Sequence, residues 1–142
     1  MLARGLSPVQ VEMSGLMSAL KSLTDHGSTL FKVSCNFHCD EPVHVEDHGM
    51  ATHVYRIAQE AIHNAVRHGK ARRIDVVLSR DKTGVVLRIL SDGDSGPVAQ
   101  LTGGDGMGLH TMTYRARLIG GELQIHPRES SGTEVVCTFP WE

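Results

Sequence analysis

The apolar positions of the chain change their spacing along its length. Between residues 49 and 68, apolar side chains recur every three or four residues, as on one face of a helix. The segments 73–79 and 85–90 instead alternate apolar and polar side chains, and a short turn sequence separates them, so they predict a hairpin with one apolar face. The same pattern predicts a second hairpin from 122–126 and 134–139.

A helix is also predicted near the N-terminus, where Leu16, Leu20 and Leu23 share one face. Pro8 precedes this segment and Gly27 follows it, and both residue types are common at helix boundaries. We therefore expect the helix to end at Gly27.

The remaining segments complete the prediction of the fold. Residues 29–37 alternate loosely and predict a strand, while 109–121 return to helical spacing and end in a glycine pair. Between the hairpins, residues 91–108 are rich in glycine and too polar for a core, so they predict a long mobile loop. We expect an α/β (α+β) two-layer sandwich, with three helices on one face of a mixed, mostly antiparallel sheet.

Composition limits the class of protein. The 142 residues, 40 % of them apolar, suffice for one domain with its own core, and the net charge of −2 arises from interspersed charges. This balance gives no support for binding to nucleic acid or a membrane surface. The three cysteines fit a reducing compartment better than a disulfide framework, so we expect a cytoplasmic domain without direct membrane contact.

Three potential metal ligands, Cys35, His38 and Cys39, lie close together in VSCNFHCD. No second pair follows at the spacing that zinc sites require, so the sequence disfavours a metal site there.

The long helix carries an unusual polar row. Glu60, Asn64 and His68 recur at every fourth residue and lie at the boundary of the apolar arc. Such a row suits a cleft, although a solvated polar face is the alternative.

The glycine-rich loop favours the cleft. It runs into a helix at GMGLHTM, and unpaired N–H groups at a helix N-terminus bind phosphate. Glycine-rich loops are often only flexible. Together with a carboxylate, an amide oxygen and a basic helix end, however, the loop predicts a site for a nucleoside triphosphate and Mg²⁺.

Four stretches, in this order, resemble the N, G1, G2 and G3 boxes of the GHKL (Bergerat-fold) ATPases: QEAIHNAVRHGKA, SDGDSG, GMGLHTMTYRARLIGG and SGTEVVCTFP. Within that family, the chain is most similar to the catalytic domain of bacterial sensor histidine kinases of the nitrate-sensor-like group. ARGLSP at residues 3–8, the tyrosine-arginine pair in YRARLIGG and the ending GTEVVCTFP favour that group. The resemblance covers nearly the whole chain.

The resemblance implies ATP and Mg²⁺ as cofactors and assigns roles to individual residues. Glu60 corresponds to the acidic residue that helps to activate the phosphoacceptor, and Asn64 to the asparagine that binds Mg²⁺. The other implied nucleotide-binding positions are Arg67 and His68 near the phosphates, Ser91, Asp92 and Gly93 in the G1 box, Gly106, Gly108 and Leu109 at the ATP lid, and Thr133 near adenine.

One position departs from the family pattern. The family has an Asp that accepts a hydrogen bond from the adenine amino group, and the direct alignment puts Ser91 there. Asp92 takes this place only if the strand slips by one residue, which would invert its side-chain alternation. A serine hydroxyl accepts such a bond more weakly than a carboxylate does.

The resemblance implies a protein-histidine kinase catalytic domain that spans residues 1–142, with 1–8 as a remnant of the linker from a dimerisation region. It would transfer the γ-phosphoryl of ATP to a histidine on that region, which this chain lacks, and act through it on a response regulator. The alternatives are an anti-sigma-factor-like serine kinase and a nucleotide-binding or interaction module without kinase activity.

Overall fold

The structure is a computed structural model that describes residues 15–93, 107–129 and 131–140, except for the side chain of Met107. These ranges contain three helices and five strands. The helices are α1 (Gly15–Phe31), α2 (His48–Arg67) and α4 (Met107–Leu118). The strands are β1 (Ser34–His38), β2 (Arg73–Arg80), β3 (Val85–Ser91), β4 (Glu122–Pro127) and β5 (Thr133–Phe139).

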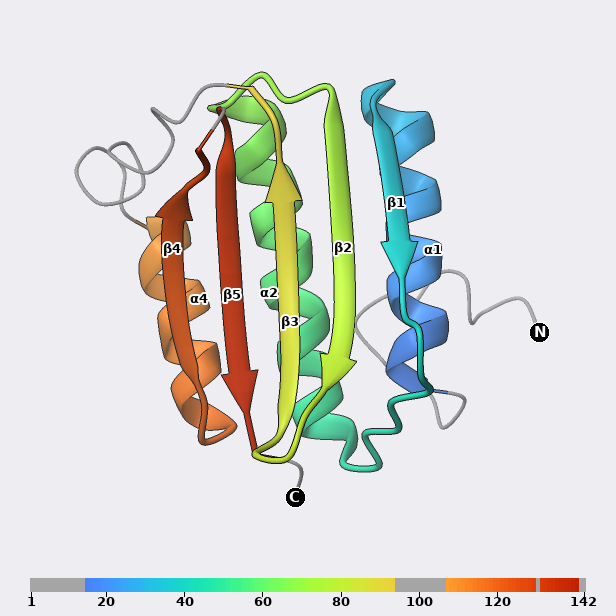
Figure 1. Ribbon diagram of the computed structural model, residues 1–142, viewed down its shortest axis with the longest axis vertical. Coiled ribbons are helices and arrows are strands. Elements are labelled where there is room, and N and C mark those ends of the chain that lie inside the picture. Colours follow the sequence, from blue (N-terminus) through green and yellow to red (C-terminus); the bar gives the residue numbers. More distant parts are fainter. Residues whose placement is uncertain (1–14, 94–106, 130, 141–142) are drawn as a thin grey trace.

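The strands form one sheet in the order β1-β2-β3-β5-β4. Strand β1 runs parallel to β2, and the other neighbouring strands are antiparallel. All three helices lie behind the sheet in the view of Figure 1, so one face of the sheet is covered and the other is open. The predicted two-layer sandwich with a mixed, mostly antiparallel sheet is confirmed.

Helix α2 lies behind the middle of the sheet and carries much of the core (Figure 1). It begins where the Asp47 carboxylate accepts a hydrogen bond from the Met50 N–H at 3.0 Å, as an N-cap residue does. Its apolar arc is buried at Ala51, Val54, Ile57, Ala58, Ala61, Ile62 and Ala65. The helix predicted over 49–68 is thus confirmed to within one residue at each end.

The predicted end of the first helix and the predicted start of the first strand were wrong. Helix α1 continues through Gly27 to Phe31, and β1 begins only at Ser34. Gly27 is buried, and a side-chain carbon added there would lie 3.4 Å from the Cys35 sulfur, so this part of the helix packs closely against β1. Tertiary packing therefore offsets the low helix propensity of glycine.

The first predicted hairpin is confirmed as β2 and β3. Its turn is closed by the Asp81 carboxylate, which accepts hydrogen bonds from the N–H groups of Thr83 and Gly84 at 2.8 and 3.0 Å. The predicted loop over 91–108 is shorter than expected, because Ser91 belongs to β3 and α4 already begins at Met107. Its central part, 94–106, lies outside the described residues.

Within the ranges that the structure covers, no helix combines the length and the apolar character needed to cross a membrane. The predicted linker remnant at 1–8 is not among these residues.

Candidate functional site

A small cavity lies between α2, α4 and the part of the sheet where β3 ends and β5 begins. It is lined by Ala61, Asn64, Ala65, Ile89, Ser91, Met112, Thr133 and Val135. Its volume is only about 10 Å³, which is room for one water molecule at most. Three polar side chains, those of Asn64, Ser91 and Thr133, face an otherwise apolar lining.

Two of these polar groups are buried without a partner. Asn64 is 6 % exposed and its Nδ2 makes no hydrogen bond, and Thr133 is 5 % exposed with an unpaired Oγ1. Ser91 is also buried, and its hydroxyl donates a long hydrogen bond of 3.3 Å to the Thr133 carbonyl oxygen. An unpaired buried polar group costs about 1 to 3 kcal/mol. Both groups need a partner, and either a water molecule in this cavity or a bound ligand would supply one.

The polar row of α2 meets the start of α4 at this cavity. Glu60 is half-buried and Asn64 lies one turn further along, deeper than the predicted boundary of the apolar arc. A side-chain carbon added to Gly108 would lie 2.7 Å from Glu60 Oε2 and 2.9 Å from Asn64 Nδ2. The structure thus brings one predicted lid glycine against two residues of the predicted N box, and a larger residue there would require the Glu60 and Asn64 side chains to move.

The other predicted phosphate-side residues lie at the ends of α2 and α4. Arg67 is exposed in the last turn of α2, and His68 caps that helix, its N–H bonded to the Asn64 carbonyl oxygen at 2.9 Å. Leu109 is half-buried in the first turn of α4. None of these three side chains lines the cavity. Gly106 lies outside the described residues.

The structure separates the two candidates for contact with adenine. In β3 the side chains of Leu87, Ile89 and Ser91 are buried and those between them are more exposed, so the strand has not slipped. Ser91 pairs with Thr133 and faces the cavity.

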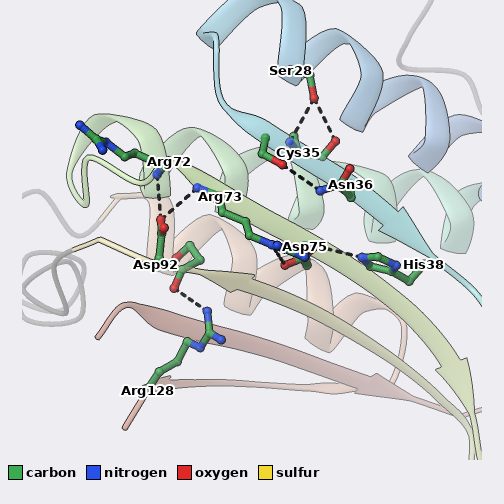
Figure 2. Close-up of polar contacts among 11 residues, drawn as sticks. Ser28, Cys35, Asn36, His38, Arg72, Arg73, Asp75, Asp92 and Arg128 are labelled. Carbon is green, nitrogen blue, oxygen red and sulfur yellow. Dashed lines mark hydrogen bonds and ion pairs between the residues drawn. The ribbon is translucent and has the colours of Figure 1, made fainter. Parts of the chain in front are cut away.

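Asp92 turns away to the start of β2. Its Oδ1 accepts hydrogen bonds from the backbone N–H groups of Arg72 at 2.8 Å and Arg73 at 3.0 Å (Figure 2). Burial alone would raise the pKa of the Asp92 carboxyl, but these bonds outweigh that effect and the pKa is lower than usual. The next residue, Gly93, has a φ of +97° and approaches the Gly69 carbonyl oxygen too closely for any side chain.

Two contacts, one at the cavity and one further along α2 and α4, had no signal in the sequence. Arg128, in the turn after β4, donates a hydrogen bond from Nη1 to the Ser91 carbonyl oxygen at 2.9 Å. Arg115 of α4 lies 2.9 Å from His53 Nδ1 of α2. Burial and then the charge of Arg115 lower the pKa of His53, so its imidazole accepts this bond. Both pairs are distant in sequence, and only the packing of the elements reveals them.

A larger hollow, of about 250 Å³, lies at the opposite end of the sheet. It is lined by His44, Val45, Glu46, Met50, Val85, Phe139 and Pro140. None of its side-chain polar atoms is both buried and unpaired, which distinguishes it from the smaller cavity. We therefore assign the candidate site to the cavity at Asn64.

The disfavoured metal site at Cys35, His38 and Cys39 gains no support from the structure. Among the residues in the described ranges, no three His, Cys, Asp or Glu side chains are grouped as metal ligands. Burial, followed by the charges of Asp75 and Asp25, raises the pKa of the Cys35 thiol to about 11. This thiol is therefore protonated at neutral pH in the metal-free protein.

The chain is similar to known proteins over most of its length. Residues 49–142 match the family model described as histidine kinase-, DNA gyrase B-, and HSP90-like ATPase. The sensor histidine kinase LiaS of Bacillus subtilis is 29 % identical over 95 % of this chain and 37 % of its own length. The nitrate/nitrite sensor protein NarX of Escherichia coli is 29 % identical over 92 % of this chain and 22 % of its own. The chain thus spans well under half of these relatives.

Solved structures share the fold. The ATP-binding domain of PrrB from Mycobacterium tuberculosis superposes with a TM-score of 0.74 at 18 % identity, covering 90 % of this chain and 95 % of that one. The histidine kinase domain of a blue-light activated kinase from Erythrobacter litoralis has a TM-score of 0.74 at 18 % identity, over 89 % of this chain and 61 % of that one. With the match over residues 49–142, the chain belongs to the family of histidine kinase-, DNA gyrase B-, and HSP90-like ATPases.

Proposed function

We propose that this chain is the ATP-binding catalytic domain of a sensor histidine kinase, which transfers the γ-phosphoryl of ATP to a histidine on a dimerisation region. The observation that carries the proposal is the cavity with two buried, unpaired polar side chains, Asn64 and Thr133, in a domain of this ATPase family. The relatives LiaS and NarX, both sensor proteins, support the kinase assignment.

Adenine is proposed to occupy the cavity. Apolar side chains such as Ala61, Ile89 and Met112 can contact its faces, while the hydroxyls of Ser91 and Thr133 can bond its polar edge. The present volume of about 10 Å³ is far too small for a purine ring, so binding must widen the cavity. Helix α4 contributes Met112 to this lining and leads out of the predicted lid, so its displacement is the simplest way to make room.

Mg²⁺ is proposed to bind at Asn64. The cation prefers oxygen ligands and usually keeps few protein ligands beside phosphates and water. The Asn64 amide lies beside the start of α4, with Nδ2 and Oδ1 at 2.9 and 3.5 Å from a side-chain carbon added to Gly108, and Oδ1 would be the ligand. When bound, Mg²⁺ would neutralise charge on the phosphates.

Glu60 is proposed to act on the acceptor histidine. Its carboxylate lies at the mouth of the site beside Gly108, close enough to Asn64 for both to face the same phosphates. As one imidazole nitrogen attacks the γ-phosphorus and ADP leaves, the other ring nitrogen loses its proton, and the Glu60 carboxylate can accept it. Arg67 and His68 would attract the phosphates from the end of α2, and Gly106, Gly108 and Leu109 would cover them.

The partners follow from this role. The domain would act on its own dimerisation and phosphoacceptor region and, through it, on a response regulator, in the cytoplasm and without binding nucleic acid. The dimerisation region would belong to the same sensor, outside residues 1–142, and the response regulator would be a separate protein.

A phosphotransfer assay tests the proposal. The chain is mixed with labelled Mg-ATP and the dimerisation region of its own parent protein, and a label that is stable to alkali and labile to acid is expected on a histidine of that region. Glu60→Gln should reduce the rate at least a hundredfold while ATP affinity changes little. Label on a serine would favour the serine-kinase alternative. Tight ATP binding without any transfer would favour a binding module.

A further inference from the structure

Arg128 connects the β4–β5 turn to the end of β3. Its backbone N–H donates to the Gly132 carbonyl oxygen at 3.0 Å, which closes the turn. Its guanidinium donates from Nη1 to the Ser91 carbonyl oxygen at 2.9 Å, and Figure 2 shows the side chain extended toward β3 beside Asp92. A charged donor makes a stronger hydrogen bond to a carbonyl than a neutral one does.

The backbone around this bond leaves little freedom. Gly132 has a φ of +101°, and a side-chain carbon added there would overlap the Ser91 carbonyl oxygen and lie 2.8 Å from the Asp92 Cα. On the other side, the Asp92 carboxylate is fixed to the N–H groups of Arg72 and Arg73. The peptide that follows Ser91 is therefore held from two sides, by Arg128 on the hairpin and by the start of β2.

The Ser91 side chain itself is held much less firmly. Its hydroxyl makes only the 3.3 Å hydrogen bond to Thr133, so the backbone sets where the hydroxyl lies in the cavity. Among the described residues, Arg128 is the one charged side chain that donates a hydrogen bond to the Ser91 backbone.

We propose that Arg128 is a positioning residue for base recognition: by holding the Ser91 carbonyl it fixes the Ser91 hydroxyl for adenine. This inference rests on the proposed function, in which that hydroxyl contacts adenine. Arg128 acts here on the base, through Ser91, and not on the phosphates. Its loss must therefore weaken adenine nucleotides selectively, because all triphosphates share the phosphate and Mg²⁺ contacts.

The test compares Arg128→Met, which keeps an apolar stem without the charge, with wild type in competition titrations of ATP and GTP. Arg128→Met should weaken ATP binding about five- to tenfold and GTP binding less than twofold, in line with the loss of one well-placed hydrogen bond. Arg128→Lys keeps a charged donor and should give an intermediate loss. Arg88→Met is the matched control. Arg88 lies on the open face of β3, the strand that contains Ser91, at 3.4 Å from Glu134, so its substitution should leave both affinities unchanged.

A second comparison tests whether Arg128 acts through Ser91. In a Ser91→Ala background, Arg128→Met should change the ratio of ATP to GTP affinity less than twofold. Equal weakening of ATP and GTP, or an undiminished effect in that background, would overturn the proposal. Thermal unfolding shows whether each variant folds. If Arg128→Met does not fold, the ratio of ATP to GTP affinity in Arg128→Lys is the deciding measurement. Wild-type protein that binds neither nucleotide would refute the proposed function, whereas ATP selectivity that survives Arg128→Met would overturn only the role of Arg128.

Discussion

Two polar clusters lie at the same end of the sheet and differ in how their hydrogen bonds are used. The cavity cluster consists of Asn64, Ser91 and Thr133, and two of its polar atoms have no partner. The edge cluster consists of Arg72, Arg73, Asp75, His38 and Asp92, and both of its carboxylates are engaged (Figure 2). Satisfied polar groups hold a fold together, whereas the unsatisfied ones in the cavity are proposed to bind the ligand.

The ionisation of the edge cluster agrees with this difference. Burial alone would raise the pKa of Asp75, but hydrogen bonds from Arg73 at 3.0 Å and from His38 at 2.9 Å, with their charges, lower it. Asp92 has a lowered pKa for the similar reason that backbone N–H groups bond its carboxylate. Substitutions should therefore affect binding in the cavity cluster and stability in the edge cluster.

The largest expected effect is on binding. Asn64→Ala should reduce Mg²⁺-dependent ATP affinity at least a hundredfold, because it removes the proposed ligand of the cation. The free energy of unfolding should change by no more than about 1 kcal/mol, since the Nδ2 of Asn64 has no partner to lose. Titration with a fluorescent ATP analogue, with and without Mg²⁺, beside denaturant unfolding measures both. A large loss of stability with unchanged affinity would place Asn64 with the structural residues.

Asp92→Ala should lower stability and leave nucleotide preference unchanged, the opposite of Asn64→Ala. It removes a carboxylate that accepts two backbone N–H groups, so the free energy of unfolding should fall by about 2 kcal/mol. The preference for ATP over GTP should persist, because Asp92 faces β2 and not the cavity. If that preference disappears while stability is kept, Asp92 is the adenine ligand after all.

Ser91→Asp should increase the preference of the cavity cluster for ATP over GTP. A carboxylate at this position would accept the adenine amino group more strongly than a hydroxyl, so ATP should gain about tenfold over GTP. The carboxylate would also lie near the Thr133 carbonyl oxygen, which now accepts a bond from Ser91, so the free protein should lose some stability. Competition titrations with the two nucleotides measure the first effect, and an unchanged ratio would argue against adenine contact at Ser91.

The smallest expected effect is a pH dependence of the edge cluster. Because the pKa of Asp92 is lower in the folded protein, its contribution to stability is present above the unfolded value of about 3.9 and is lost as the pH falls through the folded pKa. Asp92→Asn should thus be less stable than wild type at pH 7, and the difference should shrink below about pH 4. A difference that stays constant down to pH 3 would mean that the carboxylate charge does not contribute.

The sequence predicted those features that periodicity or spacing along one element determines. The bounds of α2 and the alternation of β3 followed from the apolar pattern, and that alternation also placed Ser91 rather than Asp92 on the buried face. The end of α1 was predicted wrongly because Gly27 is buried against Cys35 of β1, a long-range contact that local propensity does not reveal. The contacts of Arg128 depend on how the hairpin meets β3, a long-range arrangement with no local signal.

Nuclear magnetic resonance tests the location of the site most directly. In a titration of the labelled protein with Mg-ADP, the account predicts the largest shifts for the backbone amides of Asn64, Ser91, Gly108 and Thr133. The amides around the larger hollow, such as those of Met50 and Phe139, should hardly change. Shifts concentrated at that hollow, with the cavity cluster unaffected, would contradict the assignment of nucleotide binding to the cavity.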